Sequence, residues 1–160
     1  MNFCFKILWD QICKNSCSGP QLDLVATDLE TAYLHKANAG IYGPGSLREV
    51  PPVVMQNYFE KMKSGEKFQV RSFLKEGVIW KTHNFLEGFL HSHFHLIFLR
   101  NNLLTYYEDE LKVPAFRKIV SCLRTGGLII IGSHEKMPLG GGLFRPYNGL
   151  SCIFTPILKG

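Results

Sequence analysis

Two polar side chains come directly after apolar, strand-like segments, and both could contribute to a ligand site. Asp28 follows the segment 22–27, and Arg100 follows the segment 94–99. Apolar runs that end abruptly in polar residues are typical of buried parallel strands whose carboxyl ends open on a site. A carboxylate at Asp28 can accept both ribose hydroxyls of a nucleoside, as the acidic residue of dinucleotide-binding folds does. The alternative is a helix cap, because a helical pattern begins at Glu30.

Arg100 and Asn101 end the second of these segments. A buried guanidinium is costly unless it is paired, so we expect Arg100 to have a carboxylate partner. The alternative to a functional role is that Arg100 only holds the loops together, through an ion pair with a carboxylate such as Glu108 or Glu135.

Two sets of residues could in principle bind a metal, but their spacing gives little support for a metal site. His91, His93 and His95 alternate and would share one face of a strand, while Cys13 and Cys17 are one helical turn apart. Neither set has further ligands at a metal-site spacing, so we predict no metal. The sequence also contains no Ser-His-Asp or Cys-His arrangement that would indicate nucleophilic catalysis.

Alternating strands and helices would position these residues. We expect helices over 5–15, 30–39, 53–62 and 108–123, and strands over 22–27, 94–99 and 128–131. Pro114 should lie in the first turn of the last helix or break it. This alternation indicates an α/β fold with a mostly parallel sheet.

Two antiparallel elements are expected as well. Alternating residues over 67–74 and 78–82, separated by Glu76-Gly77, predict a β-hairpin. A second hairpin is expected between Gly140 and Phe154.

Composition limits the class of protein. The chain has 160 residues, of which 46% are apolar and 19% charged, so we predict a single domain over 1–160 with a real core. These values exclude disordered and collagen-like chains. The net charge of +5 favours an acidic partner. No apolar run is long enough to span a membrane, and five cysteines without a framework pattern indicate reduced thiols in a cytoplasmic protein.

Three segments in order carry a family resemblance. Residues 26–42 contain Ala-Thr-Asp followed by Leu34, Ala37, Gly40 and Tyr42, and residues 96–107 and 123–135 have the sequences LIFLRNNLLTYY and LRTGGLIIIGSHE. They resemble the runs A-T-D…L-x-x-A-x-x-G-x-Y, D-L-I-x-C-R-N-V-L-I-Y-F and L-x-P-G-G-x-L-x-L-G-x-S-E of the CheR-type chemotaxis receptor methyltransferases. Tyr58-Phe59 and residues 83–86 match two shorter runs, so the resemblance extends over roughly residues 22–155.

The resemblance implies a fold and a reaction. The fold would be a Rossmann-like class I methyltransferase sheet, mostly parallel with an antiparallel C-terminal strand. A small antiparallel β-hairpin subdomain would be inserted over 64–83, together with its return strand. The cofactor would be S-adenosyl-L-methionine, and the acceptors would be glutamate side chains of a chemoreceptor-like protein. A glutamate carboxylate is already ionised at neutral pH and needs no general base. The inserted hairpin would bind the partner by strand addition.

The resemblance also assigns site residues. Asp28, Asn84, Phe85, Arg100 and Asn101 would bind the cofactor, with the Asn84 amide and the Phe85 ring beside the adenine. A turn asparagine and a core phenylalanine remain the alternatives for these last two.

Arg100 and Tyr106 would position the acceptor, whereas Tyr107 falls on a packing position. The sequence departs from the family pattern at His95, Leu99, Asn102 and Thr105, where the family has Asp, Cys, Val and Ile. The family's first strand, glycine-containing loop and N-terminal helical domain should precede the helix at 5–15, so we expect an N-terminally truncated domain.

Two other functions compete with this interpretation. Methyltransferases that act on nucleic acids commonly carry an Asn/Asp-Pro-Pro-aromatic run to hold a flipped base, but residues 100–103 are Arg-Asn-Asn-Leu, so we predict no nucleic-acid partner. A non-catalytic interaction module stays open, because without the glycine loop the methionine end of the cofactor would lose its backbone donors. The oligomeric state is not predicted.

Overall fold

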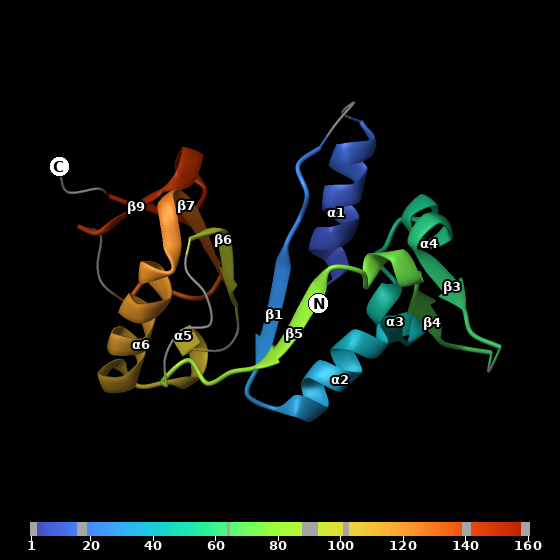
Figure 1. Ribbon diagram of the computed structural model, residues 1–160, viewed down its shortest axis with the longest axis horizontal. Helices are drawn as coiled ribbons and strands as arrows, with labels where there is room; N and C mark the ends of the chain where they lie inside the picture. The colour runs from blue at the N-terminus through green and yellow to red at the C-terminus, as the bar shows by residue number, and fades with distance from the viewer. Residues whose placement is uncertain are drawn as a thin grey trace. The chain divides into compact units, whose positions relative to one another are not determined.

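The computed structural model describes residues 3–15, 19–63, 65–87, 93–100, 103–138 and 142–157. The chain separates into two compact units, Met1–His83 and Asn84–Gly160. Each unit has its own core and its own sheets, which can be followed in Figure 1.

A pair of parallel strands forms one part of the first unit. Strand β1 (Leu24–Asp28) pairs with β5 (Val78–Thr82), in a register that sets Leu24 opposite Val78 and Asp28 opposite Thr82. Helix α2 (Thr31–Ala39) follows β1 and packs against both strands. It ends at Ala39, as the sequence predicted, and its C-cap residue Gly40 adopts a left-handed conformation with φ +63°. Glycine suits that position because it lacks a Cβ atom.

The small antiparallel sheet is present, but not as the predicted hairpin. Its strand order is β2 (Ile41–Tyr42), β4 (Phe68–Val70), β3 (Phe59–Lys61). The predicted hairpin across Glu76-Gly77 is wrong, because β5 pairs in parallel with β1 instead of with β4. Residues Ser72–Leu74 form the short 3₁₀ helix η1, and Gly77, at φ +70°, lies in the turn that follows it.

Two helices lead into this sheet. Helix α3 spans Pro44–Leu47 and helix α4 spans Pro52–Tyr58. The sequence predicted that the second helix would continue to Met62, but it ends at Tyr58 because the next residue, Phe59, is extended and pairs with Val70 in the sheet. Phe59 is buried there, so tertiary packing outweighs the local helical pattern.

The first core lies where helix α1 (Phe3–Lys14) meets these elements. It consists of Phe3, Ile7, Leu47, Tyr58, Phe59, Val70 and Leu74. The Tyr58 hydroxyl donates to Asp10 Oδ2 at 2.7 Å, and the Lys14 ammonium contacts the same oxygen at 2.7 Å. This polar link joins α1 to the end of α4 at the margin of the core.

The second unit is built on a four-stranded mixed sheet. Strands β6 (Phe94–Leu99) and β7 (Leu123–Ile131) are parallel, whereas β9 (Ile153–Pro156) runs antiparallel to both β7 and β8 (Phe144–Pro146). The parallel pair, the antiparallel C-terminal strand and the terminal hairpin are therefore confirmed.

Helices α5 (Leu103–Tyr106) and α6 (Asp109–Ser121) connect β6 to β7. Pro114 lies inside α6, neither in its first turn nor at a break, which corrects the prediction for that residue. Its ring is exposed, so water can satisfy the carbonyl group that loses its partner. Leu103, Phe116 and Ile129 are completely buried at the centre of the second core. None of the described helices is long and apolar enough to cross a membrane.

Candidate functional site

Asp28 is the last residue of β1 and lies half-buried at the carboxyl end of a parallel strand pair. Its Oδ1 atom accepts a hydrogen bond from the Glu30 backbone N–H at 3.0 Å. Helix α2 begins at Thr31 with Glu30 as its N-cap, so Asp28 is not the capping residue itself but supports the turn before the helix. Within the described residues, the Oδ2 atom of Asp28 has no hydrogen-bond partner. One carboxylate oxygen is therefore free to accept from a ligand hydroxyl.

Two threonines at the same edge were missed by the sequence analysis. Thr82 ends β5 opposite Asp28, and its hydroxyl lies 3.2 Å from the hydroxyl of Thr31, at the start of α2. The His83 backbone N–H donates to the Asp28 carbonyl oxygen at 2.9 Å, which extends the parallel pairing by one residue. Thr82 could have been found from its position opposite Asp28 in the strand register. That register is known only once β5 is recognised as the partner of β1.

The second unit begins with Asn84 and Phe85. Asn84 Oδ1 accepts from the Leu86 N–H at 3.0 Å, and its Nδ2 donates to Glu87 Oε1 at 2.9 Å. Phe85 is half-buried and packs against the second core. These contacts favour the alternative left open by the sequence, a turn asparagine and a packing phenylalanine, and the adenine role of both residues stays a prediction.

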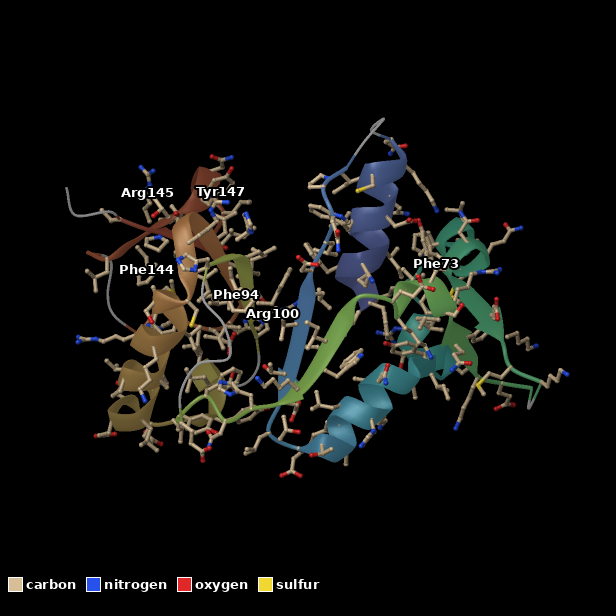
Figure 2. All side chains as sticks on the ribbon, in the orientation of Figure 1. Phe73, Phe94, Arg100, Phe144, Arg145 and Tyr147 are labelled. Carbon is tan, nitrogen blue, oxygen red and sulfur yellow. The ribbon has the colours of Figure 1, made fainter. Side chains whose placement is uncertain are left out.

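Arg100 follows β6 directly, and its side chain can be located in Figure 2. It is exposed rather than buried, and among the described residues no carboxylate lies within ion-pair distance of it. The expectation of a buried, paired guanidinium is therefore wrong, since solvent at the strand end removes the desolvation cost that would require a partner. Asn101 lies outside the described residues.

Tyr106 ends the short helix α5, Tyr107 follows it, and the two side chains differ in environment. Tyr106 is 76% exposed, whereas Tyr107 is half-buried against the second core, as its predicted packing position requires. The preceding residue, Thr105, donates from its hydroxyl to Glu135 Oε1 at 2.6 Å. A phenol held at the end of a helix and open to solvent can contact an incoming substrate.

Asp28 belongs to the first unit, while Asn84, Phe85, Arg100 and Tyr106 belong to the second. A single site that combines all five residues therefore stays a prediction. Among the described residues, no group of three His, Cys, Asp or Glu side chains could hold a metal ion. His95 instead contacts Arg124, with 2.5 Å between the imidazole Nε2 and the guanidinium Nη1. His91 and Cys17 lie outside the described residues.

A groove of about 530 Å³ lies elsewhere in the first unit. It is lined by Val50, Pro52, Met55, Gln56, Phe59, Lys61 and Phe68, none of which is a candidate cofactor residue. Its walls come mostly from α4 and from strands β3 and β4, so the groove lies beside the small antiparallel sheet.

Comparison with known proteins agrees with the resemblance found in the sequence. The family model described as "CheR methyltransferase, SAM binding domain" matches residues 4–149. A "Chemotaxis protein methyltransferase" of Listeria innocua is 30% identical over 115 residues, which cover 72% of this chain and 43% of the relative.

Proteins with the same description occur in other bacteria. The Klebsiella aerogenes protein is 34% identical over 69% of this chain and 39% of its own length. The Vibrio parahaemolyticus protein is 28% identical over 83% of this chain and 47% of its own length. The chain thus spans less than half the length of each of these relatives.

Proposed function

The chain belongs to the CheR methyltransferase family, as its SAM-binding domain, and from this premise we propose that it takes part in transferring a methyl group to glutamate side chains of a chemoreceptor-like protein. The observation that carries the proposal within the structure is the half-buried Asp28 carboxylate, which ends a parallel strand and keeps one oxygen without a partner among the described residues. This is the position and the chemistry that a ribose diol requires.

S-adenosylmethionine supplies a methyl group bound to a sulfonium sulfur, a carbon that a carboxylate oxygen can attack directly. The oxygen–carbon bond forms as the carbon–sulfur bond breaks, and the bonding electron pair stays on sulfur. Because glutamate has an ordinary pKa of about 4.3, the acceptor is already ionised at pH 7 and no general base is needed. The protein has to align the reacting atoms and exclude water.

The chain's own residues would divide this work. Asp28 would accept hydrogen bonds from the ribose hydroxyls, and the Thr82 hydroxyl lies at the same strand edge as a further polar contact. Arg100, exposed and without a carboxylate partner among the described residues, can bind the anionic acceptor. Tyr106 would orient that acceptor from the end of α5. The proposed roles of Asn84 and Phe85 beside the adenine rest on the family resemblance.

The partner would bind through the small antiparallel sheet. Among the described strands, β3 pairs only with β4, so its other edge is open to an added strand. The apolar groove lies against the same strand and includes Lys61 at its margin. An extended receptor segment with an apolar anchor and acidic side chains fits this surface, and the net charge of +5 favours such a partner.

We place the reaction in the cytoplasm. The four described cysteines, Cys4, Cys13, Cys122 and Cys152, are free thiols, which fits a reducing compartment.

The test is methyl transfer from isotope-labelled S-adenosylmethionine to a chemoreceptor signalling fragment. We expect label in base-labile ester linkage, and no label in a matched fragment whose methylatable glutamates are replaced by glutamine. A receptor fragment that binds the chain and acquires no label would contradict transfer and would identify the chain as a non-catalytic interaction module.

A further inference from the structure

Glu135, in the loop after β7, joins two segments of the second unit that are far apart in sequence. Its Oε1 accepts from the Thr105 hydroxyl at 2.6 Å, and its Oε2 accepts from the Gly132 backbone N–H at 2.5 Å. The Glu135 N–H donates in turn to the Gly132 carbonyl oxygen at 3.0 Å. One carboxylate therefore connects helix α5 to the end of strand β7.

Helix α5 needs such a connection because it consists of only four residues. A single turn has too few internal hydrogen bonds to be stable alone. Leu103 and Leu104 anchor one side of the turn in the core, at 0% and 8% exposure. Thr105 and Tyr106 lie on the exposed side, where the hydrogen bond from Thr105 to Glu135 fixes the helix. The short distance and the ionised acceptor make this a charge-assisted bond.

We infer that Thr105 and Glu135 are positioning residues for Tyr106, and that the Thr105–Glu135 bond holds the phenol in place for the acceptor glutamate. The inference rests on the proposed function, which gives Tyr106 its role. The bond depends on the Thr105 hydroxyl, because this is the only hydrogen-bond donor of the Thr105 side chain.

Three threonine variants separate this role from general stability. Thr105→Val keeps the size and β-branching of the side chain but removes the donor, whereas Thr105→Ser keeps the donor. Thr125→Val is the matched control, because Thr125 is exposed on β7 and makes no side-chain hydrogen bond to another described residue.

Amide hydrogen exchange measures how strongly the Thr105–Glu135 hydrogen bond stabilises α5, and it does not require an active enzyme. We expect Thr105→Val to speed exchange in α5 by about tenfold, the factor that corresponds to one lost hydrogen bond to a charged group. Thr105→Ser and Thr125→Val should exchange like the wild-type chain. Glu135→Ala should speed exchange in α5 and also at Gly132, which donates to Glu135. Unchanged exchange in α5 of Thr105→Val would overturn the inference.

Kinetics then test the link to Tyr106. We expect Thr105→Val to raise the KM for the receptor fragment several-fold and to leave the KM for S-adenosylmethionine unchanged, with Thr105→Ser restoring the wild-type value. Faster exchange with an unchanged receptor KM would overturn the positioning role and leave a structural one. A wild-type chain that transfers no methyl group would overturn the proposed function and the positioning role together. The exchange data would still establish whether the Thr105–Glu135 hydrogen bond stabilises α5.

Discussion

The Asp10 carboxylate contacts two side chains at the margin of the first core. It accepts hydrogen bonds from Lys14 and from Tyr58, whose side chain is only 2% exposed as a residue of the first core. Burial by itself raises the pKa of the Asp10 carboxyl, but the hydrogen bonds from Lys14 and Tyr58 and the charge of Lys14 outweigh burial. The pKa therefore lies below its ordinary value, and the ionised form stabilises the fold.

Replacing Tyr58 by phenylalanine should lower the free energy of unfolding by about 1–2 kcal/mol at pH 7, because the variant leaves the ring in the core and removes one hydrogen bond to a charged group. A carboxyl whose pKa is depressed by folding stabilises the protein above its unfolded-state pKa, and that contribution is lost as the pH falls through the folded-state pKa. The difference between wild type and Tyr58→Phe should therefore be constant from neutral pH down to about pH 5 and should shrink below the ordinary aspartate pKa of 3.8.

Urea denaturation across this pH range measures the difference. Tyr33→Phe is the matched control, because Tyr33 is 62% exposed on α2. Equal stability of the two variants at pH 7 would show that the Tyr58–Asp10 hydrogen bond makes no net contribution to the free energy of unfolding.

His95 occupies a position at which the family pattern has aspartate, and it contacts Arg124 through its Nε2 atom. At pH 7 we expect His95→Asp to change the free energy of unfolding by less than about 1 kcal/mol, since both partners are exposed.

Thermal denaturation at pH 7 measures the difference between the two proteins. His35→Asp, on the exposed face of α2, supplies the control for a change of charge without a guanidinium partner. A change well above about 1 kcal/mol in His95→Asp alone would show that the contact with Arg124 is stronger than an ordinary surface interaction.

Among the individual elements, strands β1 and β6 could be predicted from the sequence, whereas the partner of strand β5 could not. The strand at 94–99 ends where the sequence placed it, because a continuous apolar run followed by Arg100 has one simple interpretation. Residues 78–82 have the alternation of a hairpin strand, but the partner of a strand depends on contacts with distant residues. Trp80 packs against the first core, and β5 pairs with β1, which lies more than fifty residues earlier in the chain.

Strand β7 shows the same limit. The sequence predicted a strand over 128–131, yet β7 begins at Leu123 and pairs with β6 through a register shift between Phe94 and Leu96. Gly126 has φ +76°, which accommodates that irregularity. The place of Gly126 and Gly127 inside a strand could not be predicted without knowledge of the partner strand.

Gly127→Ala should disrupt this junction. An added Cβ would lie 2.9 Å from the Arg124 carbonyl oxygen and 3.0 Å from that of Phe94, and backbone atoms cannot move aside cheaply. We expect a loss of about 1–3 kcal/mol in the free energy of unfolding, typical of overpacking. Gly45→Ala, in α3, has nothing within 4 Å of its added Cβ and should be neutral or slightly stabilising. Chemical denaturation of both variants gives the comparison, and a Gly127→Ala protein as stable as Gly45→Ala would refute the steric argument.

At the scale of the whole molecule, the candidate cofactor residues are distributed over two compact units. The place of Asp28 at the end of a parallel strand could be predicted from the sequence alone, because an apolar run that ends in a polar residue is typical of such a strand. The exposure of Arg100 and the internal hydrogen bonds of Asn84 could not, since both depend on the loops that surround them. The proposed function requires that the Asp28 carboxylate bind an adenosyl cofactor.

Calorimetric titration of the chain with S-adenosylhomocysteine measures this binding. Asp28→Asn keeps the oxygen that accepts from the Glu30 N–H but loses the charge, and Asp23→Asn removes a charge from an exposed residue that precedes β1. We predict micromolar binding by the wild-type chain and by Asp23→Asn, and binding at least about tenfold weaker by Asp28→Asn. No binding by the wild-type chain at millimolar ligand, or equal affinity of all three proteins, would contradict the account.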